Sequence, residues 1–158
     1  MVGKTVQHYQ FLERLGAGGM GEIYRAQDTR LNRFVAIKVL TGSGSSDPDR
    51  RRRFIQEAQS ASALNHPNII TIHDIVSEGD TEFMVMEYVR GVNLEQFIEQ
   101  HRKLGRQIPV DLAAFIISRI ARGLTYAHAK CDRDGRHLNI VHRDIGPKNV
   151  LVAYEGDV

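Results

Sequence analysis

The side chains best suited to do chemistry stand close together in the stretch Val141–Val152, which reads VHRDIGPKNVLV. Asp144, Lys148 and Asn149 supply a carboxylate, an amine and an amide within six positions. Pro147 fixes its own backbone angle and keeps the residue before it out of a helix, so we expect a rigid loop. Such a loop could place a proton acceptor beside a metal-binding oxygen. A polar surface loop is the alternative, because loops are generally polar.

A glycine cluster near the N-terminus is the second candidate. It spans Gly16–Gly21 and fits the pattern GxGxxG. A dinucleotide-binding fold needs a helix after the glycines, whereas the strand-like run Glu22–Ala26 follows here. A GxxxxGK[ST] phosphate loop is excluded as well, because Glu22 stands where lysine is required. The remaining interpretation is a strand–loop–strand hairpin whose backbone N–H groups can lie over a polyphosphate.

Lys38 ends the apolar run VAIK, and a lysine inside such a strand must reach solvent or find an anion. Glu57 lies on the helix face that carries Ala61 and Leu64, where a carboxylate needs a cation. We therefore expect Lys38 to pair with Glu57. Two unrelated surface charges are the alternative, since such charges are common.

Hydrophobic periodicity predicts the elements that position these residues. Alternating runs predict a small, mostly antiparallel sheet whose strands are Tyr9–Leu15, Glu22–Ala26, Phe34–Leu40, Ile69–Val76 and Glu82–Val89. A flexible segment, Thr41–Asp49, should precede a helix that carries Phe54 and Leu64 and ends before Pro67.

The second half is predicted to be helical. Helices are expected over Leu94–His101 and from about Pro109 to Ala129, followed by a polar surface loop over Cys131–Leu138. Val150–Tyr154 should form a strand, and a turn signal, Glu155–Asp157, comes after it. Because only one residue follows, we expect this strand to lack a partner and the chain to be cut there.

Bulk properties exclude several classes of function. The chain has 158 residues and a formal charge of +2, so charge alone implies no nucleic-acid or membrane partner. Its single cysteine, Cys131, fits a reducing compartment. We see no signal peptide or membrane-spanning run, so a cytoplasmic location is expected. The Arg50–Arg53 run is interpreted as a solvated helix face.

Taken together, GxGxxGxI, VAIK, a helical glutamate, MEYV and HRDxxxxN resemble the eukaryotic-like (Hanks-type) protein kinase family, most closely its bacterial serine/threonine branch. The resemblance covers essentially the whole chain. It implies an α+β, protein-kinase-like fold. An antiparallel-sheet N-lobe with one key helix and the hinge would occupy residues 1–90. The first helices and the catalytic loop of the helical C-lobe would occupy residues 91–158.

The resemblance also implies roles for individual residues. Lys38 would hold the α- and β-phosphates of ATP while bonded to Glu57, Asp144 would accept the substrate hydroxyl proton, and Asn149 would bind Mg²⁺. The other residues expected to bind ATP are Leu15, Gly16, Gly18, Gly21, Ile23, Ala36, Met86, Glu87, Val89, Asn93 and Leu151. A protein with a serine or threonine acceptor would be the substrate, and contact with a second kinase is a further expectation.

Two departures from the family pattern matter. Serine/threonine kinases usually carry lysine two residues after the catalytic aspartate, whereas this chain has Gly146. Our hypothesis is that Lys148 supplies the missing charge. The sequence also contains no Asp-Phe-Gly or Ala-Pro-Glu motif, and Arg143 therefore has no phosphorylated activation loop to bind. We expect the 158-residue chain to be inactive by itself. The alternative function is a non-catalytic protein, a pseudokinase or natural short product that binds nucleotide or a partner kinase.

Overall fold

The computed structural model describes residues 1–18, 21–40 and 47–158. They form two compact units: Met1–Asn65 with Ile70–Tyr88, and His66–Ile69 with Val89–Val158. Most of the segment expected to be flexible, residues 41–46, lies outside the described residues. Among the helices in the described residues, none is both long and apolar enough to cross a membrane.

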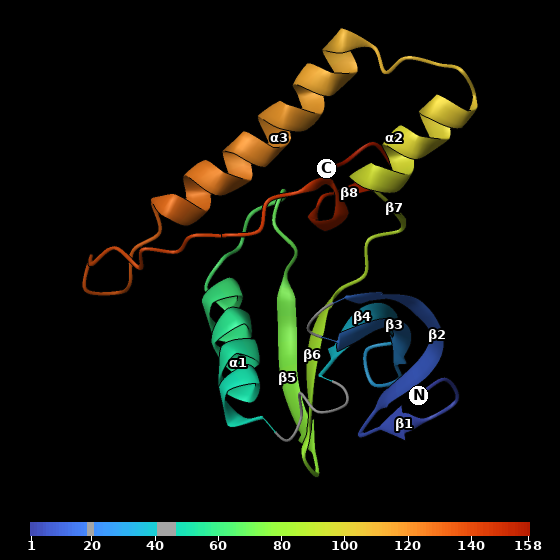
Figure 1. Cartoon of the computed structure of the whole chain (residues 1–158). Coiled ribbons are helices and arrows are strands. Elements are labelled where there is room, and N and C mark those ends of the chain that lie inside the picture. The colour runs from blue at the N-terminus through green and yellow to red at the C-terminus, as the bar shows by residue number, and fades with distance from the viewer. Residues whose placement is uncertain (19–20, 41–46) are drawn as a thin grey trace. The chain divides into compact units, whose positions relative to one another are not determined.

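The first unit is built on an antiparallel sheet of six strands, in the order β1-β2-β3-β4-β6-β5 (Figure 1). The strands are β1 (Thr5–Val6), β2 (Tyr9–Gly18), β3 (Gly21–Asp28), β4 (Arg33–Val39), β5 (Ile72–Glu78) and β6 (Thr81–Glu87). The five strands expected from alternation are therefore confirmed. Strand β1 was not predicted, because two residues are too few to show a period.

The two faces of this sheet bury different side chains, because successive residues of a strand point to opposite faces. On one face Val35, Ile37 and Val39 of β4 join a core with Phe83 and Val85 of β6. The opposite face carries the alternate residues of the same strands, and it packs against helix α1 (Pro48–Ser62). The members of that second cluster are Leu40, Phe54, Ala58 and Met84.

Helix α1 begins at Pro48, inside the segment Thr41–Asp49 that was expected to be flexible. Asp47 is the N-cap, and its side chain accepts the N–H groups of Asp49 and Arg50, while Pro48 occupies the first turn. Phe54 and Ala58, four residues apart, share one face and are almost completely buried. The helix is therefore held to the sheet mainly by this apolar face.

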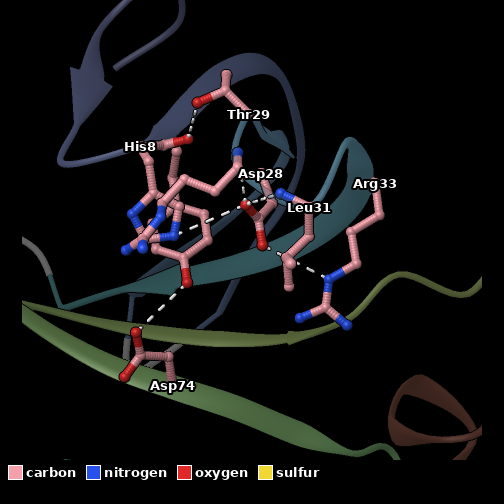
Figure 2. Close-up of polar contacts among 8 residues, drawn as sticks. His8, Asp28, Thr29, Leu31, Arg33 and Asp74 are labelled. Atoms are coloured by element: carbon pink, nitrogen blue, oxygen red, sulfur yellow. Dashed lines mark hydrogen bonds and ion pairs between the residues drawn. The ribbon is translucent and has the colours of Figure 1, made fainter.

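The sheet curls far enough to bring β2 and β5 together, although they are not neighbours in the strand order. The buried Tyr9 hydroxyl of β2 donates to Asp74 Oδ2 of β5 at 3.4 Å (Figure 2). Burial, and then the Asp74 and Asp28 carboxylates, raise the pKa of Tyr9 to about 12, so the phenol keeps its proton. A second side-chain hydrogen bond reaches β5 from the N-terminal segment, because Nζ of Lys4, just before β1, donates to the carboxylate of Glu78.

A buried carboxylate organises the turn between β3 and β4. Asp28 is 1% exposed, and its Oδ1 accepts the N–H groups of Arg30 at 3.1 Å and Leu31 at 3.0 Å (Figure 2). Nε2 of His8 lies 3.7 Å from Oδ1, and Nε of Arg33 lies 3.5 Å from Oδ2. Burial alone would raise the pKa of Asp28, but the two backbone hydrogen bonds and the neighbouring His8 and Arg33 side chains hold it below its usual value.

The second unit is mostly helical. It contains α2 (Leu94–Lys103), α3 (Val110–His128) and the short 3-10 helix η2 (Pro147–Asn149), and a small sheet of β7 (Gly91–Asn93) and β8 (Leu151–Ala153). The predicted helices and the strand at Val150–Tyr154 are confirmed. Along α3 the buried residues are Ile116, Gly123 and Ala127, which are spaced for one helix face.

The expectation that the last strand lacks a partner was wrong. Strand β8 pairs antiparallel with β7, a segment some 60 positions earlier that sequence patterns assigned only to a boundary. Gly91 makes the pairing possible, because a Cβ built there would stand 2.1 Å from the carbonyl oxygen of Val152. The partner was missed because a three-residue strand has almost no periodicity of its own.

Candidate active site

The predicted ion pair between Lys38 and Glu57 is present in the first unit. Nζ of Lys38 lies 2.8 Å from Oε1 of Glu57, and the lysine side chain is 18% exposed. The amine also lies 5.8 Å from the centre of the Phe54 ring. Strand β4 and helix α1 therefore meet at a charged pair beside an apolar contact.

Strand register places other predicted nucleotide-binding residues on the same face as Lys38. Gly16 of β2 lies opposite Ile23 of β3, and Ile23 lies opposite Lys38 of β4. Ala36, two positions before Lys38, lies opposite Met86 of β6. Because paired residues of neighbouring strands point to the same side, these side chains share one face of the sheet.

The glycines of the β2–β3 hairpin are not equivalent. Gly21 has φ +148°, and a Cβ there would stand 1.9 Å from the carbonyl oxygen of Val39. Gly16 has no atom within 4 Å of the same position. Gly18 pairs with Gly21 at the end of the hairpin. Packing thus requires glycine at position 21, whereas the space at position 16 is open.

The remaining residues that were predicted to bind ATP are divided between the two units. In the first unit, Met86 is partly buried at the end of β6, Leu15 is about half exposed, and the N–H of Glu87 donates to the Thr71 carbonyl at 2.9 Å. Val89, Asn93 and Leu151 belong to the second unit. The Asn93 side chain caps α2 by accepting the Gln96 N–H at 2.8 Å. The roles of all these residues in nucleotide binding stay predictions.

The loop between α3 and β8 holds Asp144 and Asn149 against each other. Nδ2 of Asn149 donates to the Asp144 carbonyl at 2.8 Å and to Asp144 Oδ2 at 2.9 Å. The Asp144 N–H points to Nδ1 of His142 at 3.3 Å. Gly146 is extended, as expected before a proline, and η2 follows it. The carboxylate is thus oriented by the amide but remains exposed.

Lys148 lies on the same loop and has a weak partner. Its Nζ is 3.8 Å from Oε1 of Glu95 on α2, and the two side chains are 73% and 57% exposed. An ion pair of this length and exposure contributes little, about 0–1 kcal/mol. Arg143 has a left-handed backbone with φ 64°, a conformation that costs a non-glycine residue about 1 kcal/mol or more.

Sequence patterns missed one buried polar group in the first unit, on the strand that pairs with the Lys38 strand. Glu82 of β6 is 1% exposed and bonds Arg51 of α1 and Ser77 of β5. A glutamate at the start of a strand gives no sign of burial, and Arg51 is hidden within the run of four arginines. Across the described residues, no group of three or more His, Cys, Asp or Glu side chains is placed to hold a metal ion.

Comparison with known proteins agrees with this fold and these motifs. The protein kinase domain family matches residues 9–158. The chain therefore belongs to the protein kinase domain family.

Its similarity is to bacterial serine/threonine kinases. It is 40% identical over 159 residues to the serine/threonine-protein kinase PrkC of Bacillus subtilis, which covers all of this chain and 23% of PrkC. It is 37% identical over 163 residues to the serine/threonine-protein kinase PknA of Mycobacterium tuberculosis, which covers 99% of this chain and 35% of PknA. The chain thus spans about a quarter to a third of the length of these relatives.

Solved structures show the same fold. A crystal structure of the M. tuberculosis PknI kinase domain superposes with a TM-score of 0.78 at 30% sequence identity. The match covers 99% of this chain and 59% of that kinase domain. The expected α+β, protein-kinase-like fold is therefore confirmed.

Proposed function

We propose that this chain supplies the ATP-binding face and the catalytic loop of a serine/threonine protein kinase, which transfers a phosphoryl group from ATP to a protein hydroxyl. The observation that supports this most strongly is the Lys38–Glu57 ion pair at 2.8 Å, on the sheet face that also carries Ile23 and Ala36. A largely buried amine held by a carboxylate, on the same face as the open position Gly16, suits a polyphosphate.

In this proposal the first unit binds the nucleotide. Lys38 bonds the α- and β-phosphates, and Glu57 keeps the amine directed along its face of the sheet. The hairpin strand at Gly16 offers backbone N–H groups to the phosphates, and no atom lies within 4 Å of the position that a Cβ at Gly16 would occupy. Ile23 and Ala36 provide an apolar surface for the base, and Met86 borders it.

The second unit contributes the groups for transfer. Asp144 accepts the proton of the acceptor hydroxyl, and the bond from Asn149 holds the carboxylate in one orientation. Nδ2 of Asn149 donates to Asp144, which leaves the Asn149 Oδ1 atom for Mg²⁺, a cation that prefers oxygen ligands. When bound, the metal neutralises charge that develops on the phosphates. Lys148 adds a positive charge on the same loop.

The decisive test of nucleotide binding is a titration of the chain with Mg·ATP, in the wild type and in Lys38→Met. Loss of a charged hydrogen-bond partner should weaken binding about 10- to 100-fold. Lys103→Met, an exposed lysine on α2, is the matched control and should bind like the wild type. Equal affinity of wild type and Lys38→Met would refute the proposed phosphate contact.

A second experiment separates the kinase from a non-catalytic nucleotide-binding protein. The 158-residue sequence contains no Asp-Phe-Gly motif, so we expect this chain alone to bind ATP without transferring phosphate. The full-length protein should phosphorylate serine or threonine in a protein substrate. Binding without transfer by the full-length protein would instead favour the non-catalytic function.

A further inference from the structure

An ion pair joins the first turns of helix α1 to the sheet; its Glu82 carboxylate is buried, whereas the Arg51 side chain is 43% exposed. Glu82 lies at the start of β6, and its side chain is only 2% exposed. Nε of Arg51 donates to Glu82 Oε1 at 2.8 Å, and Nη2 donates to the same oxygen. The Ser77 hydroxyl donates to the second oxygen, Oε2, at 2.7 Å. Both carboxylate oxygens therefore have partners, from α1 and from β5.

This arrangement is a poor way to gain stability. Removing a carboxylate from water costs several kcal/mol, and well-packed apolar side chains in place of such a pair are often equally or more stable. A charged pair does differ from an apolar contact in direction, since an arginine bonds a carboxylate in few geometries. Hydrophobic contact is non-directional, so Phe54 and Ala58 alone leave the helix freer to slide or turn.

The position of Arg51 on the helix allows this directional bond to orient α1. Arg51, Phe54 and Ala58 follow helical spacing and lie along one face. Glu57 stands six residues after Arg51, about 9 Å along the axis. Arg51 and Phe54 therefore attach α1 to the sheet at two points on the N-terminal side of Glu57, and two points define its orientation.

Glu82 also belongs to the sheet face that carries Lys38. Met84 lies opposite Lys38 in the β4–β6 pairing, and Glu82 is two positions before Met84 on the same side. One strand, β6, therefore supports both the lysine and the carboxylate that holds the helix.

We propose that Arg51, Glu82 and Ser77 form an anchor that positions α1 so that Glu57 reaches Lys38. They act as positioning residues for nucleotide binding and do not touch the nucleotide. This inference rests on the proposed function for its effect on ATP affinity, but its effect on the Lys38–Glu57 pair can be measured without any nucleotide.

The test compares three forms of the full-length protein: wild type, Arg51→Met, and the double variant Arg51→Met/Glu82→Met. The first readout is the melting temperature. Arg51→Met should lower it, because Glu82 then stays buried without its cation, and the double variant should recover most of the loss. The second readout is the acylation rate of Lys38 by an amine-reactive ester, measured by peptide mass spectrometry against Lys103. An amine bonded to Glu57 must leave that partner before it reacts.

In both variants we expect acylation of Lys38 to rise by about tenfold and ATP affinity to fall by a similar factor, as when one charged hydrogen bond is lost. Arg52→Met is the matched control, because Arg52 is 68% exposed on the same helix. Arg51→Lys keeps a positive charge, so its Lys38 acylation rate and ATP affinity should lie between those of wild type and Arg51→Met. A double variant with wild-type acylation of Lys38 would overturn the inference and leave a purely structural pair. If wild type binds no ATP, the proposed function fails, while the acylation readout still decides the role of the anchor.

Discussion

The two groups of candidate functional residues, one in each unit, are built in different ways. Lys38 and Glu57 lie on a strand and a helix, supported by Phe54 and by a sheet with buried residues on both faces. Asp144 and Asn149 lie on an exposed loop and are held mainly by each other. Side chains on packed strands and helices are held more tightly than those on loops, whereas loops tolerate exposure and change.

This difference suggests a division of work. A phosphate-binding lysine needs a fixed place, which a packed sheet supplies; the Lys38 side chain is only 18% exposed there, although its partner Glu57 is 45% exposed. A proton acceptor must be reached by a protein substrate, which requires an exposed position. Substitutions in the sheet should therefore alter stability and nucleotide affinity together, while those in the loop should alter turnover alone.

The largest expected effect is that of Asp144→Asn in the full-length protein. Without a proton acceptor, the turnover number should fall by about 10²- to 10⁴-fold, while ATP affinity and melting temperature stay unchanged. Steady-state kinetics with a protein substrate measure this. Asp134→Asn, in the exposed loop before the site, is the control. A large loss of melting temperature would show that the loop is not independent of the fold.

Gly21→Ala should affect the sheet most strongly. The new Cβ would clash with the Val39 carbonyl, and the backbone angle is unfavourable for alanine, so unfolding free energy should fall by more than about 1 kcal/mol. Gly16→Ala has open space and should stay within about 0.5 kcal/mol of wild type. Urea unfolding measures both. Equal stabilities of the two variants would contradict the packing argument.

Lys148→Ala tests whether this lysine replaces the one missing at Gly146. Turnover should fall about tenfold, as for one lost charged contact, with little change in ATP affinity. Glu95→Ala removes only the exposed 3.8 Å partner and should leave turnover unchanged. Wild-type turnover of Lys148→Ala would remove this residue from the mechanism.

The smallest effect concerns acid stability of the sheet. The folded pKa of Asp28 is lowered, so its stabilising contribution is complete above the unfolded value, near 4, and is lost as pH falls through the folded value. At pH 7 Asp28→Asn should be about 1 kcal/mol less stable than wild type. Denaturant unfolding between pH 7 and pH 2 should show this gap closing towards low pH. A gap that is constant with pH would mean that the charge of Asp28 is not what stabilises the turn.

Local patterns were enough to predict most of the secondary structure. Alternation located five strands and helical spacing located three helices, because each of these elements buries one face and shows the period in its own residues. The apolar surroundings of Lys38 and Glu57 predicted their contact, and the ordered motifs predicted the fold. What failed was the pairing of β8, since its partner β7 has three residues and lies far away in the sequence.

By itself, the amino-acid sequence determined the kinds of chemical group available, their order along the chain and the family to which they belong. Tertiary structure alone decided which face of the sheet carries Lys38 with Ile23, that glycine at position 21 is needed for packing, and that Glu82 is buried against Arg51. Strand register and helix docking bring together residues distant in sequence, and the free energy of those contacts depends on burial. A local sequence pattern contains neither the long-range pairing of residues nor the burial that sets the free energy of their contacts.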